Sequence, residues 1–483
     1  MKPLKTLLLL LALSLPTLAE SWELLEPEMP VVGRSGESVL FRLKGPQAHQ
    51  PFLKLSGETV THRLVEVSPG NYQTALSVPQ DTKRSLFLVD AETGLRRRLG
   101  TLQASSHCGQ LRVTSEMVTR QGPHPDYDRL TPLYPGQHVA LDGIRGGWYR
   151  LRASQTWVDG RKSPLSETDM AAFLPPNRLK RIRVEQAPNG DALLKLEMTR
   201  SPEIQAIQTG QALQFHLYDT LQTNFDIRRP SGVATFLGPI LLRPCAQPQG
   251  VIVEINEGIK YGYQIIPELE TGELTLRLRK PLPASLEGLK ITVDAGHGGL
   301  EDRGTVGHLG LEEKVLNLRV AEALAEKLRQ LGAEVTMTRL TDKAVLPESA
   351  GAGDELQSRI DHSIKRGSQL FLSVHHNARP SVEQGKIYHG TDIYWYQPHS
   401  QSLARHLADP IADAIGEESR SFRWRSFYVI RQTHSPAVLM EFQYLSNPVL
   451  EKSVLSQPDY PEKASSGVVE GLRNYLEAQA SER

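Results

Sequence analysis

The sequence lacks a surplus of either charge, because 55 Lys and Arg residues balance 55 Asp and Glu residues along its 483 positions. No overall field therefore draws the chain toward nucleic acid, and we expect no nucleic-acid partner. Beyond the N-terminus it also lacks any stretch of about 18 consecutive apolar residues, so no membrane-spanning helix is predicted. Its 32 Pro and 38 Gly residues favour several turn-rich modules over one large helical body.

Cysteine is almost absent, with Cys108 and Cys245 as the only two. In an oxidising compartment they can form one disulfide, and two separate buried thiols fit the sequence equally well. Two sulfurs alone cannot complete a zinc site. Any zinc site in this chain must therefore include other side chains.

The N-terminal residues 1–19 have the order of a secretory signal peptide. Lys2 and Lys5 precede the apolar run 7–15, and small residues follow up to a cleavage position after Ala19. The apolar run is too short to span a bilayer. We therefore predict a secreted protein, periplasmic or associated with the cell envelope, with no membrane insertion after signal removal. We also expect a monomer.

The C-terminal residues 288–478 show the pattern of an α/β domain with a largely parallel sheet. Short apolar runs alternate there with stretches of helical period, after a linker that contains Pro281 and Pro283. The expected strands are 290–294, 334–338, 370–374, 391–396 and 437–440, and the expected helices are 316–331, 400–415 and 463–477.

Four polar positions stand at the ends of these elements. His297 lies in a Gly-rich loop after the first strand, where the ligands of open α/β sheets bind. Glu313 opens the first long helix, although an acid there often only complements the helix dipole. His375 and His376 end an apolar strand and point to opposite faces, so only one can join a given site, and we choose His375. Glu441 ends another apolar strand, where a lone carboxylate is costly unless it is paired or functional.

These four segments, in this order, resemble the zinc-dependent N-acetylmuramoyl-L-alanine amidase family over residues 289–474. The agreement includes the Thr338-Arg339 pair and the Leu445-Ser446-Asn447 turn. Two positions depart from the family pattern, since Ala295 stands where Pro is usual and Gln443 where Gly is usual.

The resemblance implies that His297, Glu313 and His375 bind Zn²⁺ and that Glu441 is the catalytic carboxylate. The substrate would be peptidoglycan, cut at the amide between N-acetylmuramic acid and the L-alanine of the stem peptide. Two His and one Glu leave a fourth zinc position for water, whose proton Glu441 would take and return to the leaving amine.

Two further residues of this domain, Arg359 and Asn377, are candidate substrate-binding residues. For Arg359 the alternatives are that it orders neighbouring loops or lies on a helix surface.

The sequence of the N-terminal part predicts three small all-β modules. Residues 28–103 predict a β-sandwich, with an immunoglobulin-like arrangement as one option. Residues 108–165 resemble a bacterial SH3-like barrel, in which Trp148, Tyr149 and Trp157 are either a ligand platform or core residues. Residues 176–282 resemble the β-rich targeting domains that precede such amidases, so we expect these modules to dock the protein to the envelope. The strands expected in this third module are 179–184, 192–196, 212–217, 251–255 and 274–278.

Two other functions remain open at this point: a non-catalytic cell-wall-binding adaptor, and a zinc peptidase that acts within the stem peptide. No His is followed by Glu, so the helical His-Glu-x-x-His protease motif is absent. A Gly-x-Ser-x-Gly elbow, which would indicate a serine hydrolase, is absent as well.

Overall fold

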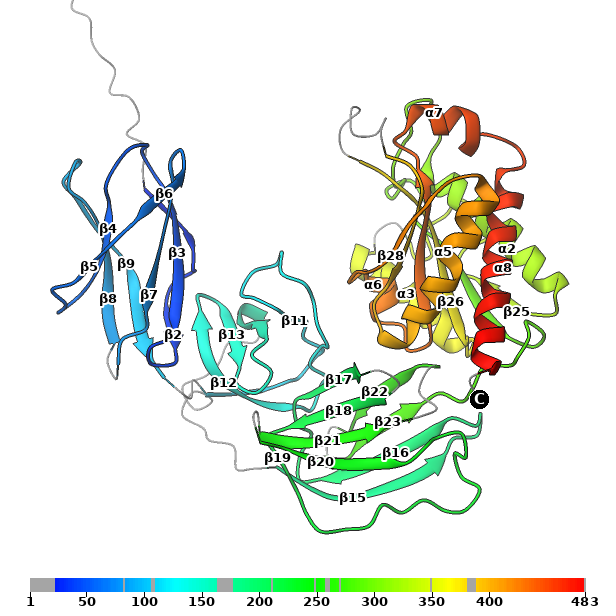
Figure 1. Cartoon of the computed structure of the whole chain (residues 1–483), viewed down its shortest axis with the longest axis horizontal. Helices are drawn as coiled ribbons and strands as arrows, with labels where there is room; N and C mark the ends of the chain where they lie inside the picture. Colours follow the sequence, from blue (N-terminus) through cyan, green and yellow to red (C-terminus); the bar gives the residue numbers. More distant parts are fainter. Residues whose placement is uncertain are drawn as a thin grey trace, which may run out of the picture. The chain divides into compact units, whose positions relative to one another are not determined.

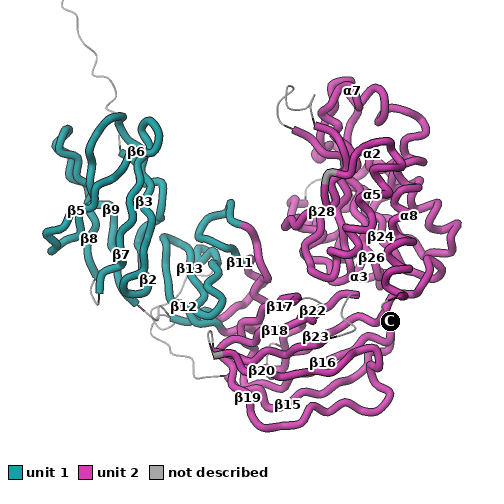
Figure 2. Tube along the Cα trace, in the orientation of Figure 1, with its two compact units in different colours: residues 1–111, 119–127, 139–174 teal, residues 112–118, 128–138, 175–483 magenta. Residues whose placement is uncertain are grey.

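The computed structural model describes most of the chain and divides it into two compact units (Figure 2). The predicted signal peptide and Cys108 lie outside the described residues, so neither the signal nor the disulfide is tested. No helix of the described part is long and apolar enough to cross a membrane. The described residues are 22–80, 83–105, 109–162, 177–209, 212–246, 249–256, 261–268, 271–347, 350–379 and 388–481.

The first unit consists of residues 1–111, 119–127 and 139–174 and is built from two sheets. One has the strand order β1-β3-β7-β6, and the other β11-β14-β13-β12-β2-β9-β8-β4-β5, with β10 beside β12. Their strands are β1 (Glu23–Glu26), β2 (Val31–Gly33), β3 (Ser38–Lys44), β4 (Phe52–Leu55), β5 (Thr61–Arg63), β6 (Val65–Ser68), β7 (Asn71–Ser77), β8 (Lys83–Asp90), β9 (Leu95–Ala104), β10 (Gly109–Arg112), β11 (Thr119–Arg120), β12 (His138–Arg145), β13 (Trp148–Leu151) and β14 (Trp157–Asp159).

Strand β2 connects the two β modules that the sequence predicts in this unit. It pairs in parallel with β9 and antiparallel with β12, so one continuous ladder runs through both. Along β3, buried and exposed side chains alternate strictly, as expected of a strand with one face on a core. Phe41 and Leu43 of that strand join Leu53 and Tyr72 in the core.

The second unit begins with two facing β-sheets, in agreement with the β-rich module predicted there. Their orders are β19-β15-β16-β23-β22 and β17-β18-β21-β20, and their apolar faces share one core around Phe215 and Leu276. The strands are β15 (Asn177–Gln186), β16 (Ala192–Met198), β17 (Ile204–Thr209), β18 (Ala212–Tyr218), β19 (Thr220–Gln222), β20 (Ile240–Ala246), β21 (Gln249–Ile255), β22 (Tyr263–Pro267) and β23 (Leu274–Leu278).

A six-stranded sheet with the order β25-β24-β26-β29-β27-β28 forms the centre of the C-terminal domain (Figure 1). Its pairs are parallel except β27 with β29, so the sheet is mixed and largely parallel, as predicted. The predicted strands are confirmed, and the structure adds β28. The strands are β24 (Lys290–Ala295), β25 (Glu334–Met337), β26 (Leu370–Asn377), β27 (Thr391–Trp395), β28 (Ser419–Trp424) and β29 (Ala437–Tyr444).

Helices cover both faces of this sheet. On one face α2, α5 and α8 share a core with alternate residues of β26 and β29, such as Leu372 and Met440. On the other face α3 and α6 pack with the intervening residues, such as Phe371 and Leu439. The helices are α2 (Glu313–Gln330), α3 (Ala352–Lys365), α5 (Gln401–Ile415), α6 (Tyr428–Arg431), α7 (Pro448–Leu450) and α8 (Tyr460–Ser481).

Candidate active site

The carboxyl ends of three neighbouring strands, β24, β26 and β29, meet at one edge of the sheet and carry the candidate residues. His375 on β26 is the register partner of Glu441 on β29. Both side chains fall on the α3 and α6 face, because they lie an even number of residues from Phe371 and Leu439. The parallel pairing therefore brings together two residues that are 66 positions apart in the chain.

The loop after β24 turns sharply at His297. Its φ of +60° lies in the left-handed region, which costs a residue with a side chain roughly 1–2 kcal/mol. Its Nδ1 lies 2.6 Å from Asp302 Oδ1, and its Nε2 therefore faces the strand ends. The strained backbone and this hydrogen bond together fix the direction of the imidazole.

The first residue of α2, Glu313, lies between the two imidazoles. Its Oε1 is 3.2 Å from His297 Nε2 and 3.1 Å from His375 Nδ1. One nitrogen or oxygen atom from each of these three residues lies within 4.8 Å of those of the other two. Two imidazole nitrogens and one carboxylate oxygen at this spacing form a donor set that can hold a metal ion.

Burial and charge shift the proton affinities of this cluster. Burial lowers the pKa of His297, but hydrogen bonds to Asp302 and Glu313 outweigh it and raise that pKa to about 10. Burial raises the pKa of Glu313, yet the hydrogen bonds and charges of the two histidines hold it well below its usual range. The carboxylate is thus held ionised, as a metal ligand must be.

The fourth candidate, Glu441, lies beside this cluster without a partner. Its Oε2 is buried and accepts no hydrogen bond from any described residue. Burial, with the nearby charge of Glu313, raises its pKa well above the usual range. A buried carboxyl oxygen without a protein donor is costly to maintain, which indicates that it acts on something outside the chain.

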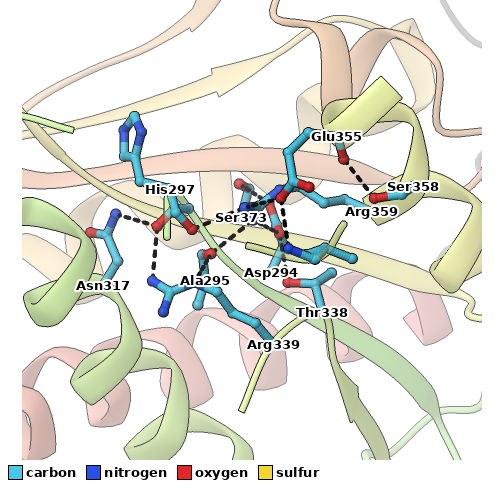
Figure 3. Close-up of polar contacts among 12 residues, drawn as sticks. Asp294, Ala295, His297, Asn317, Thr338, Arg339, Glu355, Ser358, Arg359 and Ser373 are labelled. Carbon is cyan, nitrogen blue, oxygen red and sulfur yellow. Dashed lines mark hydrogen bonds and ion pairs between the residues drawn. The ribbon is translucent and has the colours of Figure 1, made fainter. Parts of the chain in front are cut away.

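A buried ion pair supports the His297 loop from below (Figure 3). Asp294 Oδ1 accepts hydrogen bonds at 2.8 Å from Arg359 Nη1 and from Thr338 Oγ1, and its Oδ2 accepts one at 2.6 Å from Ser373 Oγ. Arg359 also donates to the carbonyl oxygen of His297 at 2.9 Å. Its side chain is 3% exposed, so it is no helix-surface residue.

The second histidine of β26, His376, lies on the opposite face. Its ring nitrogens lie 2.7 Å from Asn317 Oδ1 and 2.9 Å from the Tyr460 hydroxyl. Burial lowers its pKa to about 3, so the ring is neutral. Its backbone N–H donates a hydrogen bond to Glu313 Oε1, so His376 helps to hold one of the candidate metal ligands.

A buried carboxylate on the far side of the sheet edge holds the loop before Glu313. Glu451 is fully buried, and its two oxygens accept the backbone N–H groups of Leu309 and Leu311 at 2.8 and 3.1 Å. The sequence did not predict this role of Glu451, because the residue follows a turn that belongs to no recognisable motif. Gln443, the departure from the family pattern, is buried and accepts N–H groups of Gly390 and its own neighbour in the chain.

All four predicted residues line one cavity of about 420 Å³. Asn377 and Arg359 line it as well. The sequence analysis missed one wall, which is formed by Leu356 and by the run Phe427, Tyr428 and Val429 at α6. In the sequence, only the adjacent aromatic residues Phe427 and Tyr428 could have indicated this wall. Apolar walls around a few convergent polar groups are typical of a binding site.

The C-terminal domain is similar to known amidases. The pattern of the family described as N-acetylmuramoyl-L-alanine amidase matches residues 291–474. The germination-specific N-acetylmuramoyl-L-alanine amidase of Bacillus subtilis is 30% identical over 205 residues, which are 41% of this chain and 84% of that protein. The probable cell wall amidase LytH of Staphylococcus epidermidis is 32% identical over 193 residues, which are 40% of this chain and 60% of LytH. The chain thus spans less than two thirds of LytH.

A solved structure is also similar to part of this chain. The catalytic domain of CwlV, an amidase of Bacillus (Paenibacillus) polymyxa var. colistinus, has 32% sequence identity and a TM-score of 0.34. The match covers 38% of this chain and 97% of that domain.

Proposed function

Since the chain belongs to the N-acetylmuramoyl-L-alanine amidase family, we propose that it hydrolyses the amide between N-acetylmuramic acid and L-alanine in peptidoglycan. The observation that carries this proposal is the convergence of His297, Glu313 and His375 beside the unpartnered Glu441 in one cavity. A binding adaptor would not need an ionised donor set with a buried carboxyl oxygen next to it.

The residues of this site fit a zinc ion. His297, Glu313 and His375 would hold it, which is the three-ligand pattern of catalytic zinc sites with one open position. Asp302 on the second nitrogen of His297 provides the outer carboxylate that such sites use to orient a ligand. When bound, zinc supplies a Lewis acid that polarises the scissile carbonyl and acidifies a water molecule.

The protein groups around the cavity supply proton transfer and positioning. Glu441 accepts the proton that the attacking water loses and delivers it to the leaving amine of L-alanine, because an amine leaves poorly unless protonated. Asn377, the last residue of β26, lines the same cavity and would contact the substrate. Arg359 has its hydrogen bonds directed to Asp294 and to the loop backbone, so it positions the His297 loop.

The other modules place this activity at the cell envelope. Residues 1–19 direct export, which makes the protein secreted and either periplasmic or bound to the envelope. The β-sandwich of residues 28–103, the SH3-like barrel of 108–165 and the β-rich domain of 176–282 dock the enzyme to the wall. The β-rich folding of all three regions supports this arrangement.

Digestion of purified sacculi by the full chain tests the amidase proposal. The wild type should release intact stem peptides with a free L-alanine amine, and a chelator should stop the release. Glu441→Gln should keep the metal, measured by elemental analysis, and lose nearly all activity. Glu470→Gln, at an exposed position of α8, is the matched control and should retain activity.

Mass analysis of the released fragments separates the rival functions. Fragments cut inside the stem would identify a peptidase. Sacculus binding by metal-loaded protein without any release would identify an adaptor. Either result would contradict the amidase proposal.

A further inference from the structure

A second cavity, of about 100 Å³, lies in the second unit, and residues of α6 line both it and the catalytic cavity. Its wall combines the segment around Glu116 and Tyr134, strand β22, and the C-terminal domain at Tyr396, Arg431 and Gln432. Unlike the catalytic cavity, it contains none of the candidate metal ligands. The amidase proposal does not use it.

Arg431, which lines this cavity, has one guanidinium nitrogen without a hydrogen-bond partner among the described residues. The residue is 4% exposed, and its Nη1 donates to the carbonyl and hydroxyl oxygens of Ser426 at 2.8 and 3.1 Å. Its Nη2 is buried and has no hydrogen-bond partner among the described residues. Its guanidinium carbon lies 5.1 Å from the centre of the Tyr428 ring, which offsets only part of the lost hydration. A buried cation with a free donor indicates an anionic or strongly accepting ligand.

Among the described residues that line this cavity, none carries a buried negative charge that would balance Arg431. Burial and the charge of Arg129 lower the pKa of Arg431 to about 10, so it stays protonated at neutral pH. Among the described residues of the wall, Glu116 alone carries a carboxylate; it is exposed and accepts a hydrogen bond from Gln432. Burial lowers the pKa of His434 to about 4, which leaves that ring neutral. The buried cation of Arg431 therefore faces one solvent-exposed anion at this wall.

We propose that this cavity binds a small carboxylate, with Arg431 Nη2 as its main donor. A guanidinium matches the geometry of a carboxylate better than that of a spherical anion. Tyr134, also at the wall, carries a hydroxyl group that can supply a further donor. The volume accommodates a ligand of acetate size, so the group bound is either a free small acid or the end of a peptide.

Binding here is connected to the catalytic cavity through α6. This helix has Tyr428 and Val429 on the catalytic cavity and Arg431 on the second one. The Tyr428 hydroxyl also donates to Gln357 Oε1, and Gln357 lines the second cavity. A carboxylate on Arg431 thus holds the helix that forms the aromatic wall of the catalytic cavity.

Thermal unfolding of the full metal-loaded chain in sodium acetate, against sodium chloride at equal ionic strength, tests the proposal. Acetate should raise the unfolding midpoint in a saturable way, and chloride should not. Arg431→Gln should abolish this response. Glu116→Gln keeps the oxygen that accepts from Gln432 and removes the opposing charge, so it should strengthen acetate binding severalfold.

Amide hydrogen exchange locates the bound acid. Acetate should slow exchange in peptides that cover residues 426–434 of the wild type and of Glu116→Gln. The dipeptide Ala-Ala, tested in parallel, separates the two sources, because slowing by acetate alone identifies a free acid and slowing by both identifies a peptide terminus. No slowing, or equal affinity of wild type and Glu116→Gln for acetate, would overturn the proposal. This second variant keeps the test valid if Arg431→Gln fails to fold.

Discussion

Breaking the buried pair of Asp294 and Arg359 by Asp294→Asn should strongly destabilise the C-terminal domain. Their side chains are 1% and 3% exposed, and the change removes the charge that balances the guanidinium. Loss of one partner of a buried pair typically costs about 3–5 kcal/mol, because the other charge remains buried and unpaired. Thr338 and Ser373 also donate hydrogen bonds to this carboxylate, so we expect a loss of unfolding free energy near the upper end of this range.

The matched control is Glu334→Gln, which breaks a surface pair. Lys290 and Glu334 are 3.5 Å apart with side chains 46% and 63% exposed, a setting where an ion pair contributes about 0.2–1 kcal/mol. Urea titration of the full chain, read by hydrogen exchange in peptides from β24 and β26, gives the free energy of opening for this sheet. If Asp294→Asn costs no more than Glu334→Gln, the assignment of a supporting role to the buried pair is wrong.

The same pair predicts how stability depends on acid. Burial raises the pKa of Asp294, but the charge of Arg359 and three hydrogen bonds outweigh this and lower it below the usual value. The ionised Asp294 carboxylate therefore contributes its full stabilisation above its pKa in the unfolded chain, about 3.9. This stabilisation is lost as the pH falls through its lower pKa in the folded protein. Between pH 7 and 5 stability from this group should stay constant. Below about pH 4 the wild type should lose stability more steeply than Asp294→Asn.

Two other substitutions test how the proposed metal ligands are positioned. Gly296→Ala should reduce zinc content by more than tenfold, because the added Cβ would lie 2.2 Å from Nε2 of His375, whereas Gly353→Ala meets nothing within 4 Å and should leave it unchanged. Normal zinc content in Gly296→Ala, by elemental analysis, would show that the ring can move aside. Glu451→Ala frees two backbone N–H groups in the loop before Glu313 and should weaken zinc affinity about 10–100-fold in a chelator competition, with Glu451→Gln intermediate. Unchanged zinc affinity in both Glu451 variants would show that this loop does not help to position Glu313.

The sequence by itself determined the chemistry of the site. His375 and Glu441 could be recognised because each follows an apolar run within a buried strand, where a polar side chain rarely lies without a task. The period of two along a strand also predicts that His375 and His376 face opposite ways, and the structure places them so. These are local properties, set by burial and side-chain alternation within a few residues.

Only the tertiary structure decided what surrounds these residues. Arg359 reads in sequence as a polar helix residue, and it is buried because Asp294, 65 positions away, balances its charge. Tyr428 and Arg431 belong to a four-residue helix too short to leave a periodic pattern, yet they line two separate cavities. The ladder through β2 likewise depends on pairing between distant strands. Charge balance, cavity walls and strand order depend on contacts between residues far apart in the chain. A local sequence pattern cannot predict such contacts.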